Sequence, residues 1–156
     1  MNNIATHNSP AWGPRSNFII RADLSSDGMP GRLEQLWVRK IEPTVFEICC
    51  IPFFTYGLAL GDKVQSSSDY TIQNITEKGG HKTLRIAVAN QEKQDYLHQV
   101  LHDWVESTGL LYEWYAPGYL AVDLPPDVHG REELSALDQW SEIGAISIEI
   151  DVHEEA

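Results

Sequence analysis

The strongest candidate for metal chemistry is a stripe of histidines and acids in the second half of the chain. His98 and His102 are four residues apart, and Asp95 and Glu106 continue the same side of a predicted helix. Metal sites use imidazoles at this spacing. A zinc protease would need a glutamate directly after the first histidine, where this chain has Gln99. We therefore interpret the stripe as the outer polar face of an amphipathic helix and expect no metal ligands there.

The remaining catalytic candidates have ordinary structural explanations. Asp62 follows Gly61, and an aspartate in such a turn commonly accepts hydrogen bonds from nearby backbone amides. Cys49 and Cys50 are adjacent in a predicted strand, so their side chains point to opposite faces and are expected to stay reduced. The sequence contains no nucleophile elbow, P-loop or dinucleotide-binding glycine pattern. We therefore expect that the protein is not an enzyme and needs no cofactor.

The charge of the chain limits its partners. Among 156 residues, 23 are Asp or Glu and 11 are Lys or Arg, which gives a formal charge of −12 spread over most of the chain. Nucleic acids and anionic membranes are disfavoured, because both require clustered basic residues. A basic protein partner is favoured, because opposite potentials speed encounter. The sequence has no signal segment and no apolar stretch long enough to span a bilayer, so we expect a cytoplasmic protein.

The elements that must position these residues follow from hydrophobic periodicity and turn residues. In the second half, the pattern predicts the order β-α-β-β-α-β. This is the ferredoxin-like arrangement, in which two helices cover one side of a four-stranded antiparallel sheet. Its expected strands are 83–89, 110–115, 119–124 and 145–152, and its expected helices are 91–107 and 131–143.

The first half of the chain is typical of a curved, mostly antiparallel β unit. Residues 1–16 mix Asn, Pro, Gly, Thr and His without periodicity and are expected to form a flexible tail. Residues 17–78 contain short β-branched and aromatic runs separated by turn formers. The predicted fold is therefore α+β, with this β-rich unit packed against a ferredoxin-like unit over residues 81–153 in one compact globule.

A hydrophobic motif in the β-rich unit resembles that of a known family. Leu36-Trp37-Val38-Arg39 is followed by the run from Ile51 to Asp62, which reads I-P-F-F-T-Y-G-L-A-L-G-D. The motif resembles the signature LWxR followed by IPFFxxGxxxGD, which marks a small bacterial domain family of unknown function, and the resemblance covers residues 33–124. Some members look like immunity proteins, the antitoxins encoded beside polymorphic toxins of the Rhs type in interbacterial competition. The resemblance implies such a role and supplies no catalytic residues.

Two groups of residues are candidates for binding a toxin. Alternation along the strand 110–115 places Tyr112 and Trp114 on one face of the sheet and Glu113 and Tyr115 on the other. The second pair either anchors an interface or packs the sheet against the β-rich unit, and we weigh these interpretations equally. Acids of the closing helix form the other group, for which a solvated face is the alternative. The predicted toxin-binding residues are Glu113, Tyr115, Glu132, Glu133, Asp138 and Glu142.

We expect the partner to be a toxin with a basic cleft, because toxins that act on NAD or nucleic acid must hold phosphates. An ADP-ribosyltransferase or a nuclease would fit, and the immunity protein would occlude its active site. The alternative function is a small-molecule-binding or regulatory ferredoxin-like module, with its ligand beside Tyr112, Trp114, Gly57 and Gly61.

Overall fold

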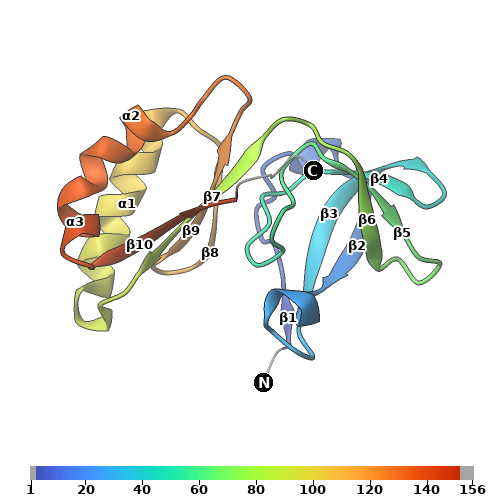
Figure 1. Ribbon diagram of the computed structural model, residues 1–156, viewed down its shortest axis with the longest axis horizontal. Coiled ribbons are helices and arrows are strands. Elements are labelled where there is room, and N and C mark those ends of the chain that lie inside the picture. The colour runs from blue at the N-terminus through green and yellow to red at the C-terminus, as the bar shows by residue number, and fades with distance from the viewer. Residues whose placement is uncertain (1–2, 152–156) are drawn as a thin grey trace.

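Two β-sheets, each with its own hydrophobic core, make up residues 3–151, the part of the chain that the computed structural model describes (Figure 1). Sheet A comes from the first half of the chain. Sheet B comes from the second half and carries the helices on the face that points away from sheet A (Figure 1). The predicted α+β class is confirmed. The described helices are too short or too polar to cross a membrane.

Six of the described strands form sheet A, which curves until its ends nearly meet. The order is β1-β3-β4-β5-β6, and β2 also pairs with β3. Neighbours are antiparallel except β1, which runs parallel to β3. A bridge between Arg21 and Thr71 brings β2 to β6, so the sheet approaches a closed barrel. The strands are β1 Ile4–Ala5, β2 Phe18–Asp23, β3 Leu33–Glu42, β4 Val45–Ile48, β5 Lys63–Ser66 and β6 Ile72–Glu77.

The long strand β3 connects the core of sheet A to the space between the sheets. Its side chains alternate, so that Glu34, Leu36 and Val38 are buried. Leu36 and Val38 join the apolar core together with Phe46 and Ile48 of β4. Glu34 lies at the end where β1 pairs, outside that apolar cluster. The same alternation therefore buries a carboxylate beside the core.

Sheet B has the strand order β10-β7-β9-β8, with every neighbour antiparallel. This is the order of the predicted ferredoxin-like unit. Leucines and Trp104 of α1, together with Leu137, close its core against the strands. The elements are β7 Lys82–Val88, α1 Gln94–Thr108, β8 Tyr112–Ala116, β9 Tyr119–Leu124, α2 Arg131–Leu134, α3 Asp138–Glu142 and β10 Ile146–Ile150. The end of the expected closing strand and of the expected unit, residues 152–153, lies outside the described residues.

The second predicted helix, 131–143, is broken into α2, a 3-10 turn at Ser135–Leu137 and α3. Two side chains explain the break. The indole N–H of Trp104 donates to the carbonyl of Glu133 at 2.7 Å, and the hydroxyl of Ser135 donates to the carbonyl of Glu132 at 2.7 Å. Both carbonyls would accept helix hydrogen bonds in a continuous helix, so these donors compete with the regular pattern.

The prediction of an unpacked tail is wrong for residues 3–16. Ala5 pairs with Glu34 through β1, and both Ala5 and His7 are buried. Farther on, the backbone N–H of Trp12 donates to the carbonyl of Cys49 at 2.9 Å. Residues 3–16 are therefore part of the fold.

Three further 3-10 turns are present, at Gly13–Arg15, Leu24–Asp27 and Gln91–Lys93. Residues 1–2 lie outside the described range.

Candidate functional site

The motif loop, residues 51–57, lies between the two sheets. Ile51 and Phe53 are buried and form a small cluster with Ala121 of sheet B. Tyr115 and Tyr119 pack around this cluster. No strand is assigned within these seven residues, so side chains must satisfy many of the loop's buried backbone polar groups.

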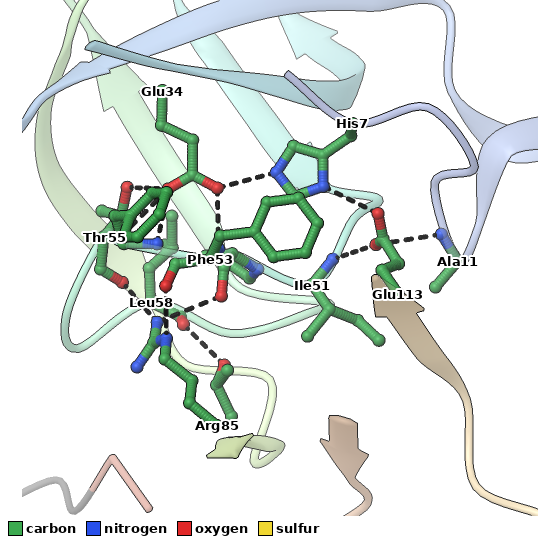
Figure 2. A network of polar contacts seen from close by, with 12 residues as sticks. His7, Ala11, Glu34, Ile51, Phe53, Thr55, Leu58, Arg85 and Glu113 are labelled. Carbon is green, nitrogen blue, oxygen red and sulfur yellow. Dashed lines mark hydrogen bonds and ion pairs between the residues drawn. The ribbon is translucent and has the colours of Figure 1, made fainter. Parts of the chain in front are cut away.

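One carboxylate, that of Glu34, binds three successive N–H groups in the middle of the loop (Figure 2). Glu34 accepts hydrogen bonds from the backbone N–H of Phe53 at 2.7 Å, and from those of Phe54 and Thr55 at 3.0 Å each. The hydroxyl of Thr55 adds a fourth bond at 2.8 Å. Three successive amides converging on one anion form a nest, an arrangement that favours negative charge. Glu34 therefore fixes the loop conformation from β3.

Arg85 binds the carbonyls of the same loop from β7 (Figure 2). Its Nε donates to the carbonyl of Phe53 at 2.8 Å, and its Nη2 donates to those of Pro52 and Thr55 at 3.1 Å each. Its Nη1 lies 2.8 Å from Oδ1 of Asp151, an ion pair without hydrogen-bond geometry. Because Arg85 belongs to sheet B, these bonds attach the loop to the second sheet.

His7 joins carboxylates from both sheets (Figure 2). Its Nε2 lies 2.7 Å from Oε2 of Glu34, and its Nδ1 lies 2.7 Å from Oε1 of Glu113 on β8. These three side chains are 0%, 0% and 2% exposed. The imidazole also stacks on the ring of Phe53, with 4.2 Å between centroids. The other oxygen of Glu113 accepts from the N–H of Ile51 at 2.6 Å.

The charges in this cluster support one another. Burial works against a charged imidazole, but contacts with Cys50, Glu113 and Glu34 outweigh it and raise the pKa of His7 well above its usual 6.5. Burial also opposes the charge of Glu34, yet His7 and the N–H donors hold the pKa of Glu34 below its usual 4.5. Burial raises the pKa of the Cys50 thiol, which has no exposed surface. Both ring nitrogens of His7 are occupied, so the cluster supports the loop and offers no activated thiol.

The structure buries the predicted residue Glu113 between the sheets, and it leaves Tyr115 partly exposed beside the motif loop. They do lie on the face of sheet B opposite Tyr112 and Trp114, as alternation predicts. Glu113 binds His7, and Tyr115 contacts the rings of the motif loop, including Phe54 at 4.7 Å between centroids. Of the two interpretations of this pair, the one in which it packs sheet B against the β-rich unit therefore holds. Glu113 is corrected from a toxin-binding candidate to a buried residue, because the N-terminal segment and the loop cover it.

The other four predicted residues lie on the helical layer, which we define as residues 91–108 and 131–142. Glu132, Asp138 and Glu142 are exposed, and Glu133 is partly exposed. The layer contains eight acidic and two basic residues, a formal charge of −6, whereas residues 3–80 contain eight acidic and seven basic residues. Half of the net charge of the chain is therefore gathered in the helical layer.

An apolar group that sequence reasoning missed lies at the α3 end of this layer. Tyr96 is 58% exposed and Ile143 is 69% exposed. The ring of Tyr96 contacts that of Trp140 edge-on, at 5.7 Å between centroids. Exposed acids neighbour these residues in the sequence, among them Asp95 beside Tyr96 and Glu142 beside Ile143. The sequence did contain one sign of this exposure, because Tyr96 lies outside the apolar stripe of α1.

The histidine stripe has a packing role. His98 lies 4.1 Å from the ring of Trp114 and accepts from the N–H of Gly118 at 3.2 Å. His102 contacts Tyr112 edge-on at 6.2 Å. These rings therefore lie partly buried against β8 and do not form a solvated outer face. Within residues 3–151, no group of three or more His, Cys, Asp or Glu side chains is arranged so that it could hold a metal ion.

Asp62 has the structural role that the sequence predicts. It is buried and accepts from the N–H groups of Ala59 and Gly79 at 2.9 Å each. Its Oδ2 also lies 2.5 Å from Nζ of Lys78. The aspartate therefore connects two turns at one end of sheet A.

The residues expected to bind a small molecule are not brought together. Tyr112 and Trp114 pack toward α1, on the face of sheet B opposite the motif loop that contains Gly57. A cavity of about 690 Å³ is lined by residues 127–133, and one of about 250 Å³ lies over β1 and β2. Neither cavity includes the expected ligand-binding residues.

Comparisons with known proteins place this architecture in a family. The chain is similar to a solved structure described as a hypothetical protein from Neisseria gonorrhoeae, with a TM-score of 0.65 and 20% identity over 90% of this chain and 99% of that chain. At this identity the likeness shows a shared fold. No curated protein matches the chain. A family pattern described as domain of unknown function DUF4265 matches residues 34–148, which include Glu34, the motif loop and Arg85. The chain therefore belongs to the DUF4265 family.

Proposed function

We propose that this protein is a cytoplasmic immunity protein that binds a cognate polymorphic toxin of the Rhs type and occludes its active site. The observation that carries the proposal is the helical layer, which combines a formal charge of −6 with an exposed apolar group. A surface of this kind fits a basic protein surface better than it fits a nucleic acid or a membrane.

The charge of the layer indicates which toxins it would suit. Enzymes that act on NAD or nucleic acid bind phosphates through Arg and Lys side chains. Carboxylates such as those of Glu132, Asp138 and Glu142 present similar oxygen acceptors to a basic cleft. An ADP-ribosyltransferase or a nuclease is therefore the kind of partner that we propose, and binding over its cleft would exclude the substrate.

The apolar group adds an apolar contact site at the α3 end of the acidic surface. Tyr96, Trp140 and Ile143 offer an aromatic pair and an aliphatic side chain at the surface. Binding energy at protein interfaces concentrates in such groups, while surrounding charges set association rate and partner choice. We assign the apolar group to affinity and the acids to association rate.

The first test is co-expression with the toxin domain encoded beside this gene, followed by affinity co-purification and a growth assay. A stable complex that restores growth is expected. Absence of a complex at micromolar concentration would refute the proposal.

The second test locates the surface by charge reversal. Asp138→Lys and Glu142→Lys should each slow association about tenfold at low salt, with a smaller effect at high salt. Glu42→Lys, an exposed change on sheet A, is the control and should leave the rate nearly unchanged. Equal effects at all three positions would mean that overall charge, and not the helical layer, governs binding.

A third test separates affinity from charge. Tyr96→Ala should raise Kd at least about 30-fold if its ring is an anchor. Ile143→Ala is compared with Leu111→Ala, because Leu111 is an exposed aliphatic residue just before β8. Weakening at Leu111 without weakening at Tyr96 and Ile143 would move the interface away from the α3 end of the layer.

A further inference from the structure

We propose that residues 3–16 form a strap that His7 locks across the junction of the two sheets, and that the strap opens as a unit when the charged imidazole is lost. The inference concerns the fold itself and does not depend on the proposed toxin. The strap crosses from β1, paired to sheet A, to Glu113 of sheet B (Figure 2). His7 is thus the one side chain of the strap that binds carboxylates of both sheets.

Contacts at its two ends also hold the strap, among them an ion pair of 2.9 Å between Arg15 and Glu47 and an edge-on contact between the rings of Trp12 and His81. Its β1 pairing with β3 covers two residues, and the N–H of Leu33 donates to the carbonyl of Asn3 at 2.9 Å. The N–H of Ala11 donates to Glu113 at 3.2 Å, and that of Trp12 donates to the carbonyl of Cys49 at 2.9 Å.

The apolar contacts of the strap come from a few side chains, of which Ala11 packs on the cluster of Ile51 and Phe53 and Trp12 is partly buried. Within the strap, Ala5 is the one fully buried apolar side chain, and it is small. Alanine buries far less apolar surface than the leucines and phenylalanines of the two cores. The charged contacts of His7 hold the middle of the strap, and they are its contacts with carboxylates of both sheets.

The geometry around His7 calls for an imidazolium. Each ring nitrogen lies 2.7 Å from a carboxylate oxygen, and a neutral imidazole has one N–H for two such contacts. The groups that face the ring are Glu34 from β3, Glu113 from β8 and the Cys50 thiol that follows β4, with Phe53 stacked on its face. Without the charged ring, two buried carboxylates would face each other across a dry space.

Loss of the imidazolium should therefore release the strap before it affects either sheet. The glutamates keep their other donors, since Glu34 is held by the loop amides and Glu113 by Ile51. The cores of the two sheets do not include His7. We expect local opening of residues 3–16, with the sheets and the helical layer still folded.

The direct experiment is titration of His7 in the wild-type protein by ¹⁵N NMR of the imidazole. Both ring nitrogens should be protonated at neutral pH, and the proton should leave well above the usual pKa of 6.5. A singly protonated ring at neutral pH would overturn the proposal, because one glutamate would then hold the proton. This measurement needs no variant, so it tests the charge of His7 even if substitutions at His7 prevent folding.

Hydrogen exchange tests the strap as a unit. In His7→Gln, the amides of Ala11 and Trp12 should exchange at least about 100-fold faster, whereas those of α1 should change little. His129→Gln, at an exposed histidine, is the matched control and should leave all amides unchanged. Equal acceleration in strap and α1 would show global destabilisation and overturn the local lock. No acceleration in the strap would overturn it as well.

Discussion

Replacement of Glu34 by glutamine tests how the motif loop is held. The amide keeps the size of the side chain but has one oxygen in place of two. If that oxygen faces Phe54 and Thr55, the NH₂ group faces the N–H of Phe53 and Nε2 of His7, which lie 2.7 Å from the native carboxylate. Two buried donors then lack an acceptor. Each costs roughly 1–3 kcal/mol, so we expect a loss of about 4 kcal/mol in unfolding free energy.

Urea unfolding measures this loss, and the thermal midpoint should fall by about 8–16 °C. Glu42→Gln is the control, because Glu42 is an exposed residue of the same strand, and its effect should stay within about 0.5 kcal/mol. The pKa of Glu34 is lowered in the fold, so its carboxylate stabilises above 4.5 and this contribution disappears as pH falls through the folded pKa. The Glu34→Gln penalty should therefore shrink in acid. A penalty below about 1 kcal/mol at neutral pH would refute the reasoning.

Three further predictions concern titration and the buried groups. The pKa of His7 is raised in the fold, so the stability advantage of wild type over His7→Gln should be complete below pH 6.5 and should decline as pH rises through the folded pKa. Thermal melting of both proteins at a series of pH values measures this decline. Tyr119→Phe removes the 2.6 Å bond to the carbonyl of Phe53 and should cost about 1 kcal/mol in urea unfolding; no change would show that this bond contributes nothing. Burial raises the pKa of Cys49 to about 11 and also raises the pKa of Cys50 above its usual value, so neither thiol should react with a thiol reagent until the protein unfolds. A fast reaction in the native protein would contradict their burial.

The arrangement of sheet B could be predicted from the sequence because its signals are local. Apolar residues at helical spacing mark α1, and Gly109 ends it with a φ of 73°. The alternation in β8 assigns Tyr112 and Glu113 to opposite faces without any knowledge of the partner layers. The break after α2 could not be predicted, because one of the two donors that explain it, Trp104, comes from another helix.

The centre of the molecule could not be predicted because it depends on distant pairs. His7 and Glu113 are 106 residues apart, and their individual sequence contexts give no sign of the other. Charged residues are rarely buried, so a single sequence places Glu113 at the surface by default. The buried acid of β3, Glu34, had a weak signal, since it occupies the inward phase of a strand whose other inward residues are apolar. The alternation of side chains along one strand thus indicates which residues are buried, whereas the sequence gives no sign of which distant residues they contact.

The long separation within the His7 cluster has a consequence for the order of folding. His7 precedes its second partner, Glu113, by 106 residues along the chain. Contacts between such distant residues close large loops and form after local structure. Until β8 has joined sheet B, Glu34 can bind the motif loop while residues 3–16 remain undocked and solvated. Residues 3–16 should therefore be the last to dock, and the final step of folding should be the pairing of the His7 imidazolium with Glu113.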